Sequence, residues 1–568
     1  MEMDEGLPAD ADETVGFTLP YLICLKNTFS IKSNLIDIVA KEIYAAELII
    51  ENNKIGSITK ISEKVSTYIL PGFVDAHVHV ESSMLVPSEF ARIAVTHGTV
   101  GTISDPHEIA NVLGVAGVDY MIDNAKQVPF HFYFGAPSCV PATNFETAGA
   151  VIDSNDIDKL LSRKEIVYLA EMMNFPGVIY KDEEVLKKLA SAKKHNKPVD
   201  GHAPGLMGDD MKHYFNAGIT TDHECFGYIE ALEKLQHGVK VLIREGSAAK
   251  NFETLISLLK DYPEQIMFCC DDKHPDNLIE SHINDHVKRA LKEGHDLYNV
   301  LRAASYNVVK HYNLPIGLVQ LGDHADFIEI DNLQDFTILK TYINGNLVAE
   351  KGNSFIKSVD SPIVNNFNCS LKQASDFKLK SESDRIRVIE CLDGQLITDE
   401  LCVASYNVDG FEESNVEQDI LKIAVVNRYS DAPIAKAFIK NIGLKQGAIA
   451  SCVAHDCHNI VAVGTNDEDM CKAVNLIIKA KGGISLANGN EELVLELPIA
   501  GIMTNQAAEE VAEAYTKLDK RAKALGSKLR APYMSLSFMA LLVIPELKLS
   551  DKGLFNGKSF QFTDVFVK

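Results

Sequence analysis

Short apolar runs alternate with amphipathic stretches between residues 71 and 324, and this alternation predicts parallel strands joined by helices. Eight of the runs have the length and composition of buried strands. We place these strands near residues 73–77, 99–104, 130–135, 166–171, 198–202, 219–223, 239–244 and 266–271. Helical patterns fall between several of them, at residues 87–97, 182–195, 209–217 and 247–260. Eight strands with intervening helices predict an α/β fold, a TIM-like (β/α)8 barrel with its active site at the C-terminal strand ends.

Two segments that flank the barrel alternate with the period of strands instead. Residues 21–70 contain the turn Asn52-Asn53, and residues 325–353 contain Asn344-Gly345, a typical hairpin turn. We expect these two segments to form one small β-sandwich domain beside a catalytic barrel at residues 71–324.

The remainder of the chain divides into a linker and a further domain. Residues 354–385 are rich in Ser, Asn and Lys, which predicts a linker with little core. Residues 386–568 mix strand and helix patterns, which predicts a C-terminal α/β or α+β domain.

Composition narrows the class of protein. The chain has 568 residues, of which 46% are hydrophobic and 24% charged, as in ordinary globular proteins. No apolar run approaches the roughly 18 residues that cross a bilayer, so no membrane anchor is predicted. A formal net charge of −24 argues against nucleic-acid partners. The acidic start MEMDEGLPADADETVG and eleven irregularly spaced cysteines favour a cytoplasmic protein with reduced thiols.

Candidate metal ligands end five of the predicted strands. The first strand ends in His77-Val78-His79, and side chains two residues apart on a strand point to the same face. Four later strands also end in an imidazole or a carboxylate: Glu171, His202, His223 and Asp271. A lone His-x-His is usually a hydrogen-bonded pair, but six such residues on one barrel rim favour a metal centre.

Six ligands exceed the needs of one ion, because a catalytic zinc usually takes three protein ligands and keeps one position open. We therefore predict two divalent ions. In this hypothesis the first ion takes Asp271 and both imidazoles of the first strand. The second takes His202 and His223, and Glu171 bridges the pair.

Longer strings around these residues resemble one known family. The order of the ligands along the chain resembles the amidohydrolase superfamily. Several segments resemble adenine deaminases. Those in the barrel are PGFVDAHVHVESSML, SDPHEIANVLG, AEMMNFPGVI, DGHAPGL, VLIREGSAAK and DDKHPDNL, and those beyond it are VAHDCHNIVAVGTND and APYMSLSFMALLVIPELKLSDKGL. The resemblance covers about residues 35–565. The chain departs from the family at Cys270, usually Thr, and at Cys457, usually Ser, but neither change removes an expected ligand.

The resemblance implies a purine-salvage activity, the hydrolysis of adenine to hypoxanthine and ammonia. It further implies two divalent ions, with Mn²⁺ expected first, Fe²⁺ as the alternative and Zn²⁺ least expected, and a homodimer. Asp271 is expected to act as a general base and then as an acid. Three rim glutamates are candidates for an acid beside the ring nitrogen N1: Glu81, Glu108 and Glu224. Three further residues are expected to contact the substrate: His107, Arg244 and Ser247.

Several alternatives stay open. The three glutamates can equally be solvated rim charges or partners that orient ligand imidazoles. His455 and His458 form an H-x-x-H, which we expect to be structural or to close over the barrel mouth rather than to bind metal. Other functional hypotheses are an amidohydrolase acting on a cyclic amide or another aminated heterocycle, and a catalytically silent barrel that serves as a scaffold.

Overall fold

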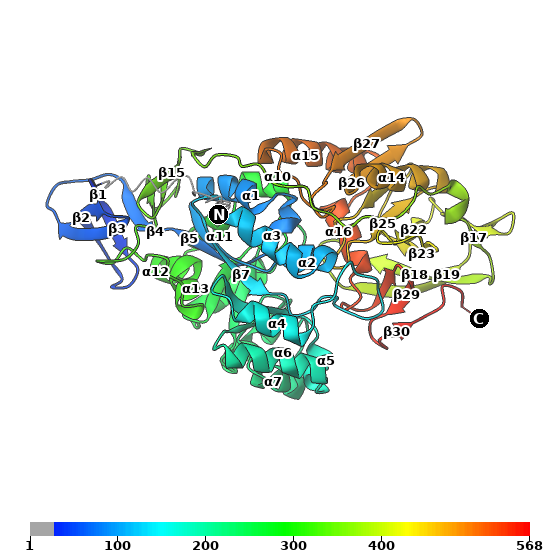
Figure 1. Ribbon diagram of the computed structural model, residues 1–568, viewed down its shortest axis with the longest axis horizontal. Helices are drawn as coiled ribbons and strands as arrows, with labels where there is room; N and C mark the ends of the chain where they lie inside the picture. The colour runs from blue at the N-terminus through cyan, green and yellow to red at the C-terminus, as the bar shows by residue number, and fades with distance from the viewer. Residues whose placement is uncertain (1–27, 568) are drawn as a thin grey trace, which may run out of the picture.

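The computed structural model describes residues 28–567, arranged as three regions along the long axis of the molecule (Figure 1). A β-sheet built from the N-terminal strands lies at one end, the barrel lies in the middle, and the C-terminal domain lies at the other end. The predicted domain start at residue 21 and the acidic N-terminus fall outside the described residues.

The predicted eight-stranded barrel is confirmed. Its strands are β5 (Phe73–Val78), β6 (Thr99–Ser104), β7 (His131–Ala136), β8 (Ile166–Met172), β9 (Val199–Gly201), β10 (Thr221–Asp222), β11 (Lys240–Arg244) and β12 (Ile266–Cys269). Strands β5 to β9 and β10 to β12 form two parallel hydrogen-bonded groups. A parallel bridge between Val78 and Asp271 connects the first strand with the end of the last one and closes the barrel.

Helices surround this barrel as the patterns predicted, with one exception. Three lie where expected: α1 (Pro87–Ala94), α6 (Glu183–Lys194) and α7 (Gly208–Asn216). The predicted helix 247–260 was wrong in its first part, because regular structure begins only with α9 (Phe252–Leu255) and the 3₁₀ turn η3 (Ile256–Lys260). The Asn251 side chain accepts a hydrogen bond from the Arg244 N–H (2.7 Å) and donates to the Cys225 carbonyl (3.2 Å), which holds residues 247–251 as a loop.

Further helices complete the barrel. They are α2 (His107–Leu113), α3 (Val115–Ala125), α4 (Ser154–Leu161), α5 (Phe175–Ile179), α8 (Tyr228–Gln236), α10 (Pro275–Glu280), α11 (Ile283–Lys292), α12 (Leu297–Leu301) and α13 (Asn307–His311).

The two segments that flank the barrel in sequence share one eight-stranded mixed sheet. Its strands are β1 (Phe29–Asp37), β2 (Glu42–Glu51), β3 (Lys54–Lys60), β4 (Tyr68–Pro71), β13 (Phe327–Ile330), β14 (Ile338–Ile343), β15 (Asn346–Glu350) and β16 (Asn353–Ser354). Strand β4 pairs with β13, so the chain returns to this sheet after the barrel is complete. Leu48 and Phe327, one from each segment, belong to the same hydrophobic cluster.

The C-terminal domain contains a second eight-stranded sheet. Its strands are β18 (Arg385–Cys391), β19 (Thr398–Ala404), β22 (Ile420–Val426), β23 (Ala435–Lys440), β24 (Ala448–Ser451), β25 (Ile460–Gly464), β26 (Gly483–Asn488) and β27 (Glu491–Glu496). Alternate residues of β22 face opposite sides, as strand geometry requires. Ala424 and Val426 pack with helix α14 (Asp467–Ala480), whereas Ile423 and Val425 belong to the hydrophobic cluster that includes α15 (Ala508–Ala524), α16 (Pro532–Ser537) and the barrel.

The segment 354–385 has more core than a linker would. Phe367, Cys369 and Phe377 are buried in the cluster that contains residues of α14 together with Ala424 and Val426 of β22. The rest of the segment is mostly irregular, apart from a 3₁₀ turn at Ala374–Phe377 and the short strand β17 (Leu379–Lys380).

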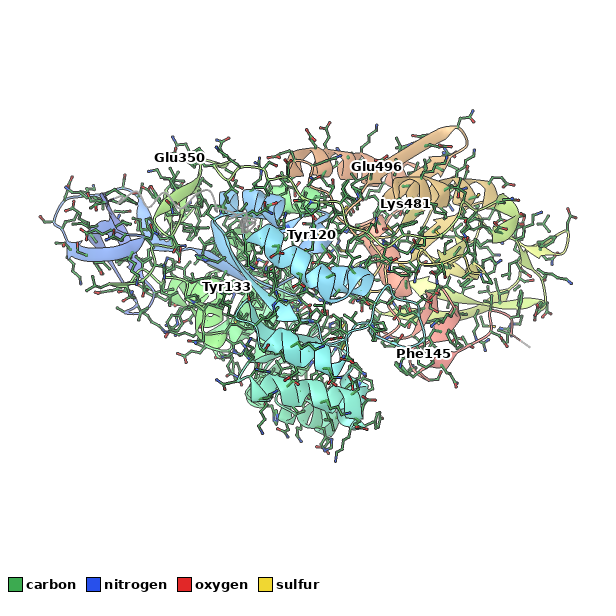
Figure 2. The ribbon with its side chains drawn as sticks, in the orientation of Figure 1. Tyr120, Tyr133, Phe145, Glu350, Lys481 and Glu496 are labelled. Carbon is green, nitrogen blue, oxygen red and sulfur yellow. The ribbon has the colours of Figure 1, made fainter. Side chains whose placement is uncertain are left out.

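The barrel and the C-terminal domain also meet through an aromatic cluster. Phe145, in the loop after β7, lies 4.8 Å from Phe555 between ring centroids and 5.6 Å from Phe562. These partners belong to the small sheet β28 (Leu547–Ser550), β29 (Gly553–Asn556) and β30 (Gln561–Phe562). Figure 2 shows Phe145 at the junction of the two regions.

Within residues 28–567 no helix is both long enough and apolar enough to cross a bilayer. Every cysteine of that range is a free thiol.

The buried aromatic of segment 354–385 gives a test of its packing. We expect Phe377→Ala to destabilise the protein by about 3–5 kcal/mol, because the side chain is fully buried and its removal leaves a cavity. The midpoint of thermal unfolding measures this change. Phe355→Ala is the matched control, because Phe355 is 53% exposed and should change the midpoint little. Equal shifts of the unfolding midpoint in the two variants would contradict the burial of Phe377 in this cluster.

Candidate active site

The first and last strands of the barrel meet at their C-terminal ends, where the predicted ligands lie. The Asp271 N–H donates to the His77 carbonyl at 2.9 Å, and the His79 N–H donates to the Asp271 carbonyl at 3.3 Å. Beneath them, Asp75 accepts hydrogen bonds from the N–H groups of His77 (3.2 Å) and Cys270 (3.1 Å). Asp271 has a φ of 56°, a left-handed conformation that Asp tolerates better than most residues. Its side chain lines the cavity at the strand ends.

Glu171, at the end of β8, is a centre of the cluster. Its Oε2 atom lies 2.6 Å from His202 Nδ1 and 3.2 Å from His223 Nε2. Its Oε1 atom lies 3.3 Å from His79 Nε2. One carboxylate therefore reaches imidazoles from three different strand ends, the position expected of a bridging ligand.

Asp271 is the second centre. Its Oδ1 atom lies 3.1 Å from His79 Nε2 and 3.5 Å from His77 Nε2. Its Oδ2 atom accepts a hydrogen bond of 2.5 Å from Arg244, which also pairs with Glu224. Burial raises the pKa of Asp271, but the Arg244 charge and the imidazoles together hold it well below its usual range.

The donor set fits two divalent cations. Several groups of ligand atoms among the described residues have all members within 4.8 Å of one another. They include the triads His77, His223 and Asp271, and Glu171, His202 and His223. The Nε2 atoms of His77 and His79 face each other at 3.2 Å. Among residues 28–567, His77 Nδ1 and His202 Nε2 are buried without a hydrogen-bond partner. Buried imidazoles and carboxylates in this arrangement suit metal ions.

The carboxylates and imidazoles of this cluster shift one another's pKa values. Burial lowers the pKa of His202, but the charges of Glu171 and Glu224 raise it overall to about 9. Burial opposes ionisation of Glu171, yet the neighbouring imidazoles hold its pKa well below its usual range.

Two of the three candidate acids line the cavity, and the third does not. Glu224 and Glu108 are lining residues. Glu81 is buried against α2, where its Oε1 accepts a hydrogen bond of 3.3 Å from the Ile109 N–H. Burial raises the pKa of Glu81 to about 7. Its position indicates contact with α2 rather than with a bound molecule.

The C-terminal domain closes the barrel mouth, one of the outcomes expected for His455 and His458. Glu108 pairs with His455 Nδ1, and its Oε2 lies 2.5 Å from His458 Nε2. His455 Nε2 lies 3.7 Å from Asp272. These contacts connect helix α2 and the loop after β12 with residues that follow the barrel by more than a hundred positions.

The three residues predicted to contact the substrate do not lie together in the structure. His107 lines the cavity, with its Nδ1 3.1 Å from Asp105 Oδ2 and 3.5 Å from Glu171 Oε1, so it lies beside the metal-type cluster. Arg244 contacts the carboxylates of Asp271 and Glu224, and it is not among the residues that line the cavity.

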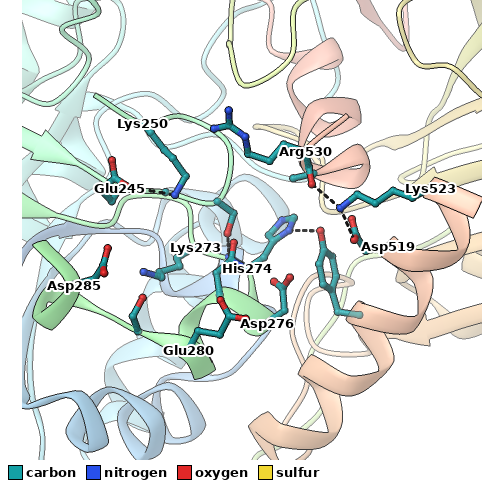
Figure 3. A pocket seen from close by; sticks show the side chains of 16 residues that line it. Glu245, Lys250, Lys273, His274, Asp276, Glu280, Asp285, Asp519, Lys523 and Arg530 are labelled. Carbon is teal, nitrogen blue, oxygen red and sulfur yellow. Dashed lines mark hydrogen bonds and ion pairs between the residues drawn. The ribbon is translucent and has the colours of Figure 1, made fainter. Parts of the chain in front are cut away.

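Ser247 lies away from the cluster. It lines a separate pocket of about 400 Å³ between the loop after β12 and helix α15 (Figure 3). Its hydroxyl accepts a hydrogen bond of 2.9 Å from the His274 N–H. Figure 3 also shows the 2.6 Å hydrogen bond between His274 Nδ1 and the Tyr515 hydroxyl, which joins the barrel to the C-terminal domain.

Apart from His455, which was expected to be structural or to close over the barrel mouth, five residues that line the cavity were not among the predicted site residues: Met173, Asp272, Asp456, Phe538 and Leu541. Asp272 directly follows a predicted ligand, and Asp456 lies within the H-x-x-H, so adjacency to known motifs would have indicated both. Phe538 and Leu541 are apolar residues of a distant segment, and no sequence signal connects them with the rim.

The cluster predicts which substitutions remove metal. We expect His202→Ala and Glu171→Gln each to lower the bound metal by about one ion per chain, because each loses a donor from the second triad. Elemental analysis of protein purified with Mn²⁺ measures this. His213→Ala, at an exposed histidine of α7, is the control and should retain the wild-type content. Full metal occupancy in His202→Ala would contradict the assignment of this ligand.

Known proteins share both halves of this architecture. A model of the amidohydrolase family matches residues 68–348, and a model of the adenine deaminase C-terminal domain matches residues 395–561. An adenine deaminase of Sulfurovum sp. (strain NBC37-1) is 54% identical over 534 residues, 94% of this chain and 99% of the relative. Another, of Borreliella burgdorferi, is 52% identical over 544 residues, with coverage of 94% and 99%. A solved structure of a β-aspartyl dipeptidase from Fervidobacterium islandicum AW-1 covers 59% of this chain and 98% of its own, at 14% identity and a TM-score of 0.44. Because identity above 50% extends over nearly the whole length of both chains, the protein belongs to the adenine deaminase family.

Proposed function

We propose that this protein hydrolyses adenine to hypoxanthine and ammonia. The observation that carries the proposal is the convergence of four imidazoles and two carboxylates on one buried rim, in a chain that matches adenine deaminases over 94% of its length. A catalytically silent scaffold is disfavoured, because all six ligand-type side chains are present and gathered.

The proposed ligands are grouped around the carboxylates of Glu171 and Asp271. In our proposal Asp271 and the imidazoles of His77 and His79 would hold one ion, and His202 and His223 would hold the other. Glu171 would serve both ions, because its two oxygens reach imidazoles on either side of the site. Divalent ions in such a site lower the pKa of coordinated water toward about 7 and so make hydroxide available at neutral pH. Mn²⁺ is the proposed metal, with Fe²⁺ as the alternative and Zn²⁺ less favoured, and this order rests on the family resemblance.

The protein's own residues move the protons. Water adds to C6 of adenine and gives a tetrahedral carbon that carries OH and NH2, and loss of ammonia leaves the C6 carbonyl of hypoxanthine. Asp271 takes the proton of the attacking water and passes it to the departing amine. Arg244 orients the Asp271 carboxylate through its hydrogen bond to Oδ2.

A second acid is needed beside N1. Attack at C6 raises the electron density of this ring nitrogen, so a donor there stabilises the transition state more than the ground state. Glu108 and Glu224 remain our candidates, because both line the cavity. Glu81 is better suited to support α2, and His107 to contact the substrate or a metal ion.

Two properties of the whole protein complete the proposal. The free thiols of the described residues suit a reducing compartment, which supports a cytoplasmic location. A homodimer is proposed from the family resemblance.

Substrate choice tests the proposed activity directly. We expect Mn²⁺-loaded protein to convert adenine to hypoxanthine, seen as a shift in the ultraviolet absorbance and as released ammonia, and to act far less on adenosine, guanine, cytosine and hydantoin-type amides. Full metal occupancy without ammonia release from adenine would reject the proposal. Preference for a cyclic amide would instead favour another amidohydrolase activity.

The proton shuttle has its own test. We expect Asp271→Asn to retain much of the metal but to lose at least about 100-fold in kcat, because the amide cannot accept the proton. Asp276→Asn is the control, since this carboxylate of α10 lines the separate pocket of Figure 3. Near-normal turnover of Asp271→Asn would rule out its role as the base.

A further inference from the structure

The lining of the active-site cavity is mostly polar, and two of its three apolar residues come from the C-terminal domain. Its apolar lining residues are Met173 from the barrel and Phe538 and Leu541 from the turn after α16. A purine base has a polar edge and two apolar faces, and those faces pack best on flat aromatic side chains. Among these three residues, only Phe538 offers an aromatic surface.

Phe538 belongs to a larger flat surface. Its ring stacks on His455, with centroids 5.2 Å apart and an angle of 24° between the planes. His455 in turn pairs with Glu108 and lies 3.7 Å from Asp272. The two stacked rings are therefore fixed to the barrel by carboxylates that follow β6 and β12.

A buried lysine supports this surface from behind. Lys548, in β28, is fully buried, and its Nζ donates hydrogen bonds to the carbonyls of Phe538 (3.0 Å) and Leu396 (2.5 Å). Leu541 donates its N–H to the same Phe538 carbonyl at 3.2 Å. Burial lowers the pKa of Lys548 to about 7, which indicates how poorly solvated this amine is. The carbonyl contact fixes the turn that carries both apolar residues.

The cavity is small and partly open to solvent. The space that it offers is about 20 Å³, which is room for about one water molecule. A purine is larger, so its binding requires part of the lining to move. The barrel side is fixed by the paired imidazoles and carboxylates, so the apolar side is the part that yields with the least loss of polar contacts.

We propose that Phe538 and Leu541 form the wall on which the purine ring packs, that Lys548 positions this wall, and that the wall limits the site to the free base rather than its nucleoside. The inference rests on the proposed function and adds its specificity-determining residues. A ribose on N9 would have to displace this apolar wall further while burying its hydroxyl groups, which is unfavourable without hydrogen-bond partners.

Steady-state kinetics with Phe538→Leu tests the stacking surface. We expect the KM for adenine to rise roughly tenfold or more, with unchanged metal content, because stacking on an aromatic ring is lost. Calorimetric titration with hypoxanthine should show a matching loss of affinity. Phe438→Leu, at a fully buried phenylalanine of β23 outside the cavity, is the matched control and should keep the wild-type KM. Equal KM values for adenine in the two variants would overturn the proposal that Phe538 stacks on the purine.

Selectivity is tested with Phe538→Ala and Leu541→Ala. We expect the ratio of kcat/KM for adenine to that for adenosine to fall at least tenfold in one or both variants, and an unchanged ratio in both would overturn the role of the wall. These outcomes are distinct from failure of the proposed function, in which the wild-type protein itself would not release ammonia from adenine.

Lys548→Met tests the support of the wall. This change keeps the length of the side chain but removes the donor to the Phe538 carbonyl. A raised KM for adenine with full metal content and little change in kcat is expected. A lowered unfolding temperature with a wild-type KM would show that Lys548 stabilises the domain without positioning the wall, and would overturn that part of the inference.

Discussion

Closure of the barrel between β5 and the end of β12 is the constraint on which the site depends. The backbone hydrogen bonds between His77, His79 and Asp271 bring ligands from the first and last strands to one place. Asp75 secures the same junction from below, because its carboxylate accepts from both strand ends. His282 lies 2.9 Å from the other Asp75 oxygen, so the junction is supported by a further buried pair. Without this closure the six side chains would have no common volume.

The C-terminal domain is part of the catalytic unit rather than an appendage. One hydrophobic cluster runs from the barrel into the face of the C-terminal sheet that carries α15 and α16. At the cavity, the same domain contributes His455 and Phe538, and Glu108 of the barrel pairs with His455. The barrel rim therefore supplies most of the charged groups, whereas the C-terminal domain supplies His455 and Asp456 together with the apolar side chains of Phe538 and Leu541. Enclosure matters for the chemistry, because electrostatic interactions strengthen when water is excluded.

The sequence alone could predict the features that depend on short spacing or on barrel geometry. The positions of the strands could be predicted from the apolar runs. The ligands could be predicted because the parallel strands of a closed barrel end on one rim. Side-chain direction within loops was not predictable in this way. Arg244 and Ser247 are three residues apart, yet Arg244 reaches Asp271 while Ser247 lies in the other pocket, because Asn251 folds the intervening residues into a loop. The roles of Phe538 and Leu541 depend on contacts between distant parts of the chain, which no local pattern encodes.

The pairing of β4 with β13 has a consequence for how the chain is made. Pro71 and Phe327 are partners in this ladder, and the entire barrel lies between them in sequence. During synthesis from the N-terminus, β1 to β4 emerge first, but the edge of β4 stays without this partner until the barrel segments have left the ribosome. An unpaired strand edge is prone to association with other chains. The native pairing of β4 therefore cannot form until the return strand β13 has been made, so this edge of the sheet is completed only after the whole barrel sequence.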